Sequence, residues 1–248
     1  VIVSSMEHNA MMRPLVQLER DGVEFSRIPA DRDGIARAED IIPLIRPNTK
    51  LVAVMHASNV CGSLLPVKEI GAICRERNIP FILDAAQTAG HYPIDFKELG
   101  LSALCAPGHK GLLGPQGIGV MLMDHEFAKS VEPLIAGGTG SASDSEELPP
   151  YMPDRFESGT MNIPGVYGLN AALTYILEKG VDHFRAHEEV LTRRFLDGLK
   201  DIPVRLAGTW DMDKRVGVIA VDFTGHDNAE AAFALEQAGI LTRCGLHC

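Results

Sequence analysis

Short runs of consecutive apolar residues recur along the first half of the chain. They cover residues 1–4, 51–55, 81–83 and 119–123. A strand buried on both faces is apolar at nearly every position, whereas a strand with one face in water alternates. The runs therefore predict buried strands of a mainly parallel sheet, and a weaker run at residues 102–106 predicts one more.

Segments with apolar residues at helical spacing separate these runs. The pattern predicts helices over residues 38–45 and 66–77. Pro66 suits the first turn of the second helix, and Asn78-Ile79-Pro80 ends it. This alternation of strands and helices is typical of the α/β fold class.

The second half of the chain has a different pattern. Residues 137–153 lose periodicity and are rich in Gly, Ser, Glu and Pro, which predicts a long loop. Helices are predicted over residues 166–179, 184–199 and 228–237, with an extended stretch at 205–206 and a strand at 217–223. We expect a large domain over residues 1–165, a linking helix over 166–182 and a partial, smaller α+β C-terminal domain over 183–248.

Composition narrows the classes of partner. The chain is 46% hydrophobic and 23% charged, as in ordinary globular proteins. No apolar run reaches the ~18 residues of a membrane span, so we expect a cytoplasmic protein with no membrane partner. A net charge of −10 without a basic cluster argues against nucleic acid and favours a small-molecule substrate. The five scattered cysteines indicate reduced thiols. The sequence opens on an apolar run without a methionine and ends without a polar tail. These two features suggest a fragment truncated at both ends.

Candidate chemistry gathers at the predicted carboxyl edge of the sheet. Asp84 and Gln87 follow the run 81–83, at the edge where open α/β sheets bind ligands. An isolated aspartate there more often caps a helix or a turn. However, Lys110 lies in a glycine-flanked loop after the next strand, at the same edge. A lysine amine partly removed from water attacks aldehydes, as a Schiff-base cofactor requires.

Six sequence blocks in this order resemble the class V aminotransferase-like family of pyridoxal-5′-phosphate (PLP) enzymes, of the cysteine desulfurase and selenocysteine lyase type. The blocks lie at residues 7–9, 56–62, 84–87, 108–110, 155–160 and 243–248. The resemblance implies a fold type I PLP-dependent transferase. It also implies conversion of cysteine to alanine, with the sulfur passed to an enzyme cysteine as a persulfide. Selenocysteine would be an equally natural substrate.

The resemblance assigns roles around the ring of PLP. Lys110 becomes the Schiff-base lysine and a proton carrier. Asp84 pairs with the protonated pyridine nitrogen, and this agrees with the physics of an ion pair in low dielectric. Gln87 hydrogen-bonds the phenolate oxygen, and His8 stacks on the ring. Asn59 lies near the phenolate oxygen and the substrate carboxylate.

The phosphate side of the resemblance is less complete. His109 takes the role of a phosphate contact. Taken alone, His8 or His109 would be interpreted as a structural histidine. Thr139 lies in a Gly-Gly-Thr-Gly segment that resembles the loop reaching the phosphate of the neighbouring subunit. This resemblance implies a homodimer with composite active sites. A flexible surface turn fits the same composition. Pro107 replaces a Ser or Thr donor, and a proline has no backbone N–H. The main phosphate loop of the family would precede residue 1.

Cys248 aligns with the cysteine that receives the sulfur. An imidazolium at His247 would favour its thiolate form. A metal site formed by Cys244, His247 and Cys248 is disfavoured because structural zinc takes four ligands. Cys61 and Cys74, like Cys105, are expected to be buried core residues.

Alternatives remain open at this point. The chain could serve another class V reaction such as transamination, with Cys248 incidental, or be a non-catalytic fragment that binds no PLP. A desulfurase would pass its sulfur on, so a sulfur-acceptor protein is a possible partner.

Overall fold

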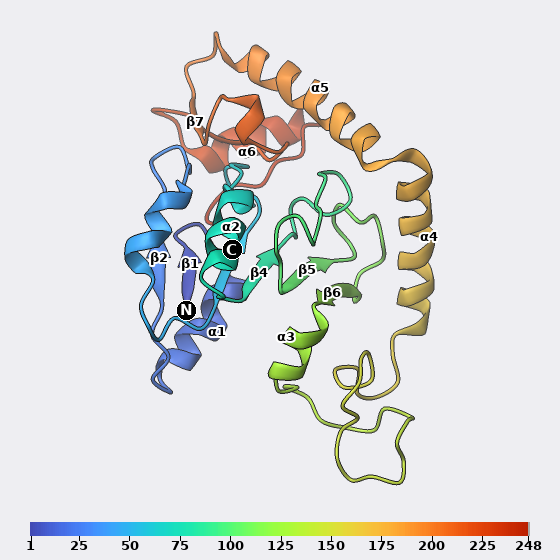
Figure 1. Ribbon diagram of the computed structural model, residues 1–248. Helices are drawn as coiled ribbons and strands as arrows, with labels where there is room; N and C mark the ends of the chain where they lie inside the picture. Colours follow the sequence, from blue (N-terminus) through green and yellow to red (C-terminus); the bar gives the residue numbers. More distant parts are fainter. Residues whose placement is uncertain (248) are drawn as a thin grey trace.

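The computed structural model describes residues 1–247 and is built on a six-stranded sheet surrounded by helices (Figure 1). The strand order is β2-β1-β3-β4-β5-β6, and the strands from β2 to β5 are parallel neighbours. Their bounds are β1 Ile2–Ser4, β2 Ser26–Ile28, β3 Val52–Met55, β4 Phe81–Asp84, β5 Ala103–Pro107 and β6 Gly119–Met123. The prediction of a mainly parallel α/β sheet is confirmed.

Strand β6 differs from the prediction. It lies at the edge of the sheet and pairs antiparallel with β5. Met121 and Leu122 are 49% and 53% exposed, so the strand is not buried on both faces. The connection from β5 is a loop without a helix, and such a connection returns the chain antiparallel. Apolar content alone could not distinguish this edge strand from a central one.

The helices of the first half are α1 Asn9–Glu19, α2 Val67–Glu76 and α3 His125–Ser130. The segment predicted as a helix at 38–45 is a 3₁₀ helix, Ala38–Leu44, and it contains Pro43, which cannot donate an α-helical hydrogen bond. Elements α1, α3 and β2 were not predicted. They are short or largely exposed, with Leu15 the buried residue of α1, so their apolar pattern is faint.

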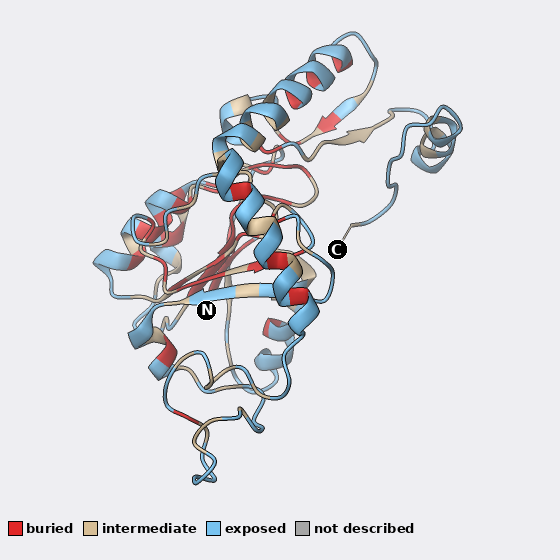
Figure 2. Cartoon of the chain, turned by 90° about the vertical axis from the view of Figure 1, so that its right-hand side faces the viewer, coloured by how far each residue is buried: buried red, intermediate tan, exposed pale blue. Residues whose placement is uncertain are grey.

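The main core lies between the sheet and the helices around it (Figure 2). Helix α2 contributes its apolar face, with Val67, Ile70 and Cys74 at helical spacing. Gly71 on the same face allows a close approach, because a Cβ there would lie 2.1 Å from the carbonyl oxygen of Leu99. Helix α2 is thereby held against the segment that leads into β5.

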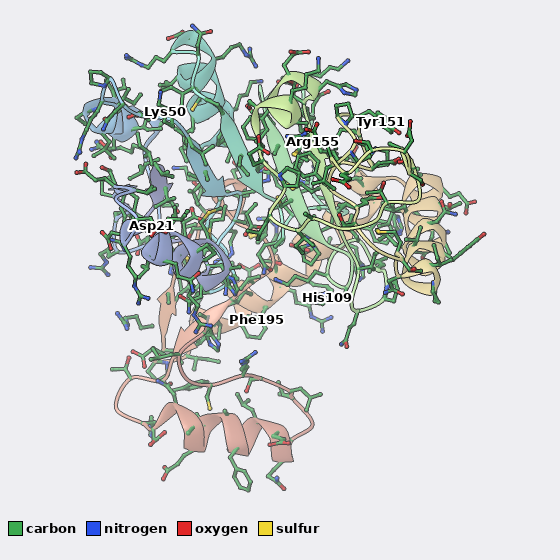
Figure 3. All side chains as sticks on the ribbon, turned by 90° about the horizontal axis from the view of Figure 1, so that it is seen from below. Asp21, Lys50, His109, Tyr151, Arg155 and Phe195 are labelled. Carbon is green, nitrogen blue, oxygen red and sulfur yellow. The ribbon has the colours of Figure 1, made fainter. Side chains whose placement is uncertain are left out.

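A long segment without helix or strand, residues 131–162, separates α3 from the following helices, as predicted for residues 137–153. Tyr151 and Arg155 lie in it (Figure 3). Helix α4 Ile163–Lys179 begins slightly before its predicted start, and α5 Val181–Leu199 follows directly. Gly180 joins them with φ 84°, a left-handed conformation that suits glycine. The two helices form an arc over the β6 side of the sheet (Figure 1).

A second, smaller core follows α5. Strands β7 Arg205–Ala207 and β8 Ala220–Asp222 pair antiparallel, and Leu206 packs with the end of α5. The strand predicted at 217–223 is thus shorter than expected. Helix α6 Asn228–Gln237 has no buried residue and projects from the rest of the chain (Figures 2 and 3). Within residues 1–247, no helix is long and apolar enough to cross a membrane. The division into three domain segments remains a prediction.

Candidate functional site

A cavity of about 670 Å³ opens at the carboxyl edge of the parallel strands. Its lining comes from the ends of β3, β4 and β5, from the segments that follow them and β1, and from β6, so residues far apart in the sequence meet there. Six residues singled out from the sequence are among them: His8, Asn59, Asp84, Gln87, His109 and Lys110. The structure therefore brings together all the ring-side candidates.

Asp84 is the last residue of β4 and is half-buried. Its Oδ1 accepts a hydrogen bond of 2.8 Å from the backbone N–H of Ala86, so this aspartate also stabilises the turn that carries Gln87. No lysine, arginine or histidine among residues 1–247 forms an ion pair with it. A partly buried carboxylate without a cationic partner fits a positively charged ligand.

Cys105 departs from the expectation of a buried core cysteine. It pairs in register with Asp84 across β4 and β5, is half-buried, and lines the cavity. Burial, and then the charge of Asp84, raise the pKa of its thiol. Cys105 therefore stays protonated and does not compete as a nucleophile. Cys61 and Cys74 are buried as predicted.

His8 has a structural role and is also part of the candidate site. It caps the start of α1, where its Nδ1 accepts a hydrogen bond of 3.0 Å from the N–H of Ala10. A nitrogen that accepts carries no proton, so the neutral ring holds its proton at Nε2. Any proton that His8 exchanges in the cavity is therefore handled by Nε2.

Glu7 was not given a role from the sequence, although it belongs to the first motif block. Its carboxylate accepts hydrogen bonds from the N–H groups of Ser4 (3.2 Å) and Met55 (3.0 and 3.1 Å), and so joins the ends of β1 and β3. Burial raises its pKa to about 7 despite these hydrogen bonds, and Asp84 adds to the shift. Only the fold reveals this acid, because its burial and its bond to Met55, 48 residues away, depend on the packed sheet.

His56 supports the site from behind. It is buried, and its Nδ1 lies 3.0 Å from Oγ1 of Thr88, in the turn after β4. Burial, with a smaller contribution from His91, lowers the pKa of His56 to about 4. The ring is neutral at physiological pH and links the end of β3 to the turn that carries Gln87.

Lys110 and His109 are more exposed than the sequence argument assumed. Both are exposed residues in the loop between β5 and β6, so the expectation of a partly desolvated lysine is wrong. The loop itself is held by hydrogen bonds from Gly108 N–H to the Ile118 carbonyl (2.9 Å) and from Gly114 N–H to the Gly108 carbonyl (2.7 Å). Lys110 thus projects from a fixed loop at the mouth of the cavity.

Thr139, another residue predicted from the sequence, does not line this cavity. Thr139 lies in the long loop, where its hydroxyl contacts Ser141. Cys248 lies outside the described residues, and nearby Cys244 is exposed. Across the described part of the chain, no group of three or more His, Cys, Asp or Glu side chains could hold a metal ion.

The residues present fit PLP. A carboxylate without a cationic partner, with the acid Glu7 close by, matches a protonated pyridine nitrogen. An amide, an imidazole and an exposed amine lie in the same cavity, and its walls include the apolar side chains of Ala57, Ala86 and Val120. Such a site is apolar around a few converging polar groups, as cofactor sites are.

Comparison with known proteins agrees with this picture. The chain is 35% identical over 254 residues to a probable cysteine desulfurase of Pyrococcus abyssi, covering 100% of this chain and 62% of that protein. It is 34% identical over 253 residues to a cysteine desulfurase of Salmonella agona, covering 100% and 61%. The chain therefore spans about three fifths of the length of these relatives.

Solved structures show the same fold. The apo structure of the cysteine desulfurase from Thermococcus onnurineus NA1 matches with a TM-score of 0.91 and 33% identity, over 98% of this chain and 61% of that one. The cysteine desulfurase CsdA from Escherichia coli matches with a TM-score of 0.85 and 26% identity, over 97% and 60%. The sheet and its helices are those of a fold type I PLP enzyme. The model of the family described as aminotransferase class-V matches residues 1–248, and the chain belongs to this family.

Proposed function

We propose that this chain forms the PLP site of a cysteine desulfurase, which converts cysteine to alanine and passes the sulfur to an enzyme cysteine. The observation that carries the proposal is the convergence of Asp84, Gln87 and Lys110 with His8 in one cavity. The names of the relatives support the choice of reaction within the family.

PLP, when bound, draws electrons from the bonds at the α-carbon of an attached amino acid. The chain's part would be to keep the pyridine nitrogen protonated, and the half-buried carboxylate of Asp84 would do so by an ion pair. The side-chain amide of Gln87 would hold the phenolate oxygen by a hydrogen bond. The ring of His8, fixed through Nδ1 at the start of α1, would hold the cofactor ring.

Lys110 is the anchor and the proton carrier. Its exposure at the mouth of the cavity leaves the Nζ atom free to reach an aldehyde there and afterwards to move a proton at the α-carbon. Asn59, on the loop after β3, orients the substrate carboxylate. His109 would help to hold the phosphate, and because Pro107 has no N–H, other groups would carry more of that contact.

Sulfur transfer falls to Cys248. Its thiolate attacks the sulfur of the substrate, an S–S bond forms, and the C–S bond of the substrate breaks. Cys248 is left as a persulfide, and the substrate carbon takes up a proton and leaves as alanine. Among the described free cysteines, none that lines the cavity is ionised, because burial keeps Cys105 as a thiol.

The proposal includes a cytoplasmic homodimer that delivers sulfur to an acceptor protein. Thr139 lies outside the cavity of its own chain, as a residue serving the neighbouring subunit would. Leu134 and Ile135, in the same loop, are 98% and 69% exposed. Apolar side chains exposed to this degree favour burial against a second copy.

The test is to locate the cofactor and the sulfur. The protein is incubated with PLP, reduced with borohydride and digested, and the label is expected on the Lys110 peptide. Lys110→Ala should abolish it, while Lys50→Ala, an exposed lysine away from the cavity, should not. Label on another lysine would overturn the anchor, and cysteine consumed without release of alanine would overturn the reaction.

A further inference from the structure

A chain of contacts connects helix α5 with the loop that carries Lys110. Nδ1 of His91 lies 2.7 Å from Oε2 of Glu188 on α5. The other oxygen, Oε1, accepts a hydrogen bond of 2.5 Å from the N–H of Gly217, in the segment before β8. Glu188 therefore joins the turn after β4 to the smaller core.

His91 rests directly on the lysine loop. A Cβ at Gly111, the residue after Lys110, would lie 2.5 Å from Cδ2 of His91 and 2.4 Å from the carbonyl oxygen of Ala89. A Cβ at Gly90 would lie 2.2 Å from the carbonyl oxygen of Gly111. The two segments touch where only glycine fits, so a shift of one moves the other.

The link is partly shielded from water. The side chains of His91 and Glu188 are 19% and 33% exposed. Burial by itself raises the pKa of Glu188, but the hydrogen bonds from His91 and Gly217 lower it below its usual value. The carboxylate is thus ionised, and hydrogen bonds to an ionised group are the stronger kind. Gly217 is part of the fit, since a Cβ there would lie 2.7 Å from Cγ of Glu188.

Lys110 also borders the space beside this link. A second cavity of about 740 Å³ lies against α5, and its lining includes Lys110, Gly111, His91, Glu188 and Gly217. Lys110 lines both cavities, so it stands at the boundary between the proposed cofactor site and the face of α5.

We propose that Glu188 is a positioning residue, which fixes the loop of Lys110 by tying His91 to the backbone of Gly217. The position of the smaller core relative to the sheet thereby affects the position of Lys110. Glu188 itself does not contact the reacting groups. The inference rests on the proposed function for the chemistry of Lys110. The link between Glu188, His91 and Gly217 does not depend on that function.

The experiment measures amide hydrogen exchange in the cofactor-free chain. Glu188→Gln removes the charge and should make exchange in residues 108–114 about tenfold faster, because loss of a charge-assisted hydrogen bond lowers the local opening free energy. Glu189→Gln is the matched control. Glu189 is the next residue on α5 and pairs within the helix with Arg185 at 2.8 Å, so exchange in 108–114 should not change.

A second variant guards against a general loss of structure. Gly217→Ala keeps every charge but displaces Glu188 sterically, and it should accelerate exchange in the same segment. Exchange in α2, remote from the link, should stay unchanged in all variants. Equal exchange of residues 108–114 in Glu188→Gln and Glu189→Gln would overturn the inference.

Labelling by PLP and borohydride separates this inference from the proposed function. If Lys110 of the unaltered protein is labelled and exchange is insensitive to Glu188, the positioning link alone fails. If exchange responds to Glu188 and no lysine is labelled, the proposed function alone fails. When both hold, labelling of Lys110 should be slower in Glu188→Gln and normal in Glu189→Gln.

Discussion

The stability of this protein should depend on pH through Glu7. Its pKa is raised from 4.5 to about 7 in the folded state, first by burial. The folded state therefore holds more protons than the unfolded state between these two values. Stability should fall as the pH rises through this window, because above it a buried carboxylate is ionised.

The size of the effect follows from the shift. A difference of about 2.5 units, from 4.5 to 7, corresponds to about 3 kcal/mol at 1.36 kcal/mol for each unit. Glu7→Gln keeps the shape and can still accept from the N–H of Met55, but it does not ionise. The free energy of unfolding of the variant, relative to the unaltered protein, should rise by about 3 kcal/mol between pH 4.5 and pH 8.

Urea unfolding at the two pH values measures this quantity, with the comparison made between variant and unaltered protein so that other titrating groups cancel. Glu24→Gln is the control, because the Glu24 side chain is 75% exposed and its variant should differ from the parent by a similar amount at both pH values. A Glu7→Gln difference that is independent of pH, or that falls as the pH rises, would refute the reasoning from burial.

Three further predictions concern the site and the core. Asp84→Asn should retain PLP, judged by its absorbance, but slow turnover about a hundredfold or more, and near-normal turnover would rule out its pairing with the pyridine nitrogen. Cys248→Ala in the complete enzyme should abolish the persulfide detected by alkylation and mass analysis while Lys110 is still labelled; a persulfide on Cys61 would contradict the assignment. Gly71→Ala should lower the free energy of unfolding in urea by ~1–3 kcal/mol, since its Cβ would lie 2.1 Å from the carbonyl oxygen of Leu99. If the variant were instead more stable by the ~1 kcal/mol that alanine usually gains over glycine in a helix, α2 would have moved without cost and the prediction would be wrong.

Local patterns in the sequence were sufficient for most of the architecture. The apolar runs located five strands of the sheet, and Pro66 with Asn78 delimited α2 closely. The first four motif blocks identified side chains that meet at one edge, because the carboxyl ends of parallel strands must lie side by side. These features depend on neighbouring residues in the chain, and periodicity and turn chemistry report on those directly.

Tertiary structure decided what depends on distant contacts. The exposure of Lys110 and the half-buried position of Cys105 follow from where the β5–β6 hairpin lies in the sheet. The raised pKa of Glu7 requires the packed chain to bury its carboxylate, and the tie from Glu188 requires α5 to pack beside the turn after β4. A sequence determines which residues can form strands, helices and motifs, but burial and ion pairing come from segments brought together only when the chain is packed.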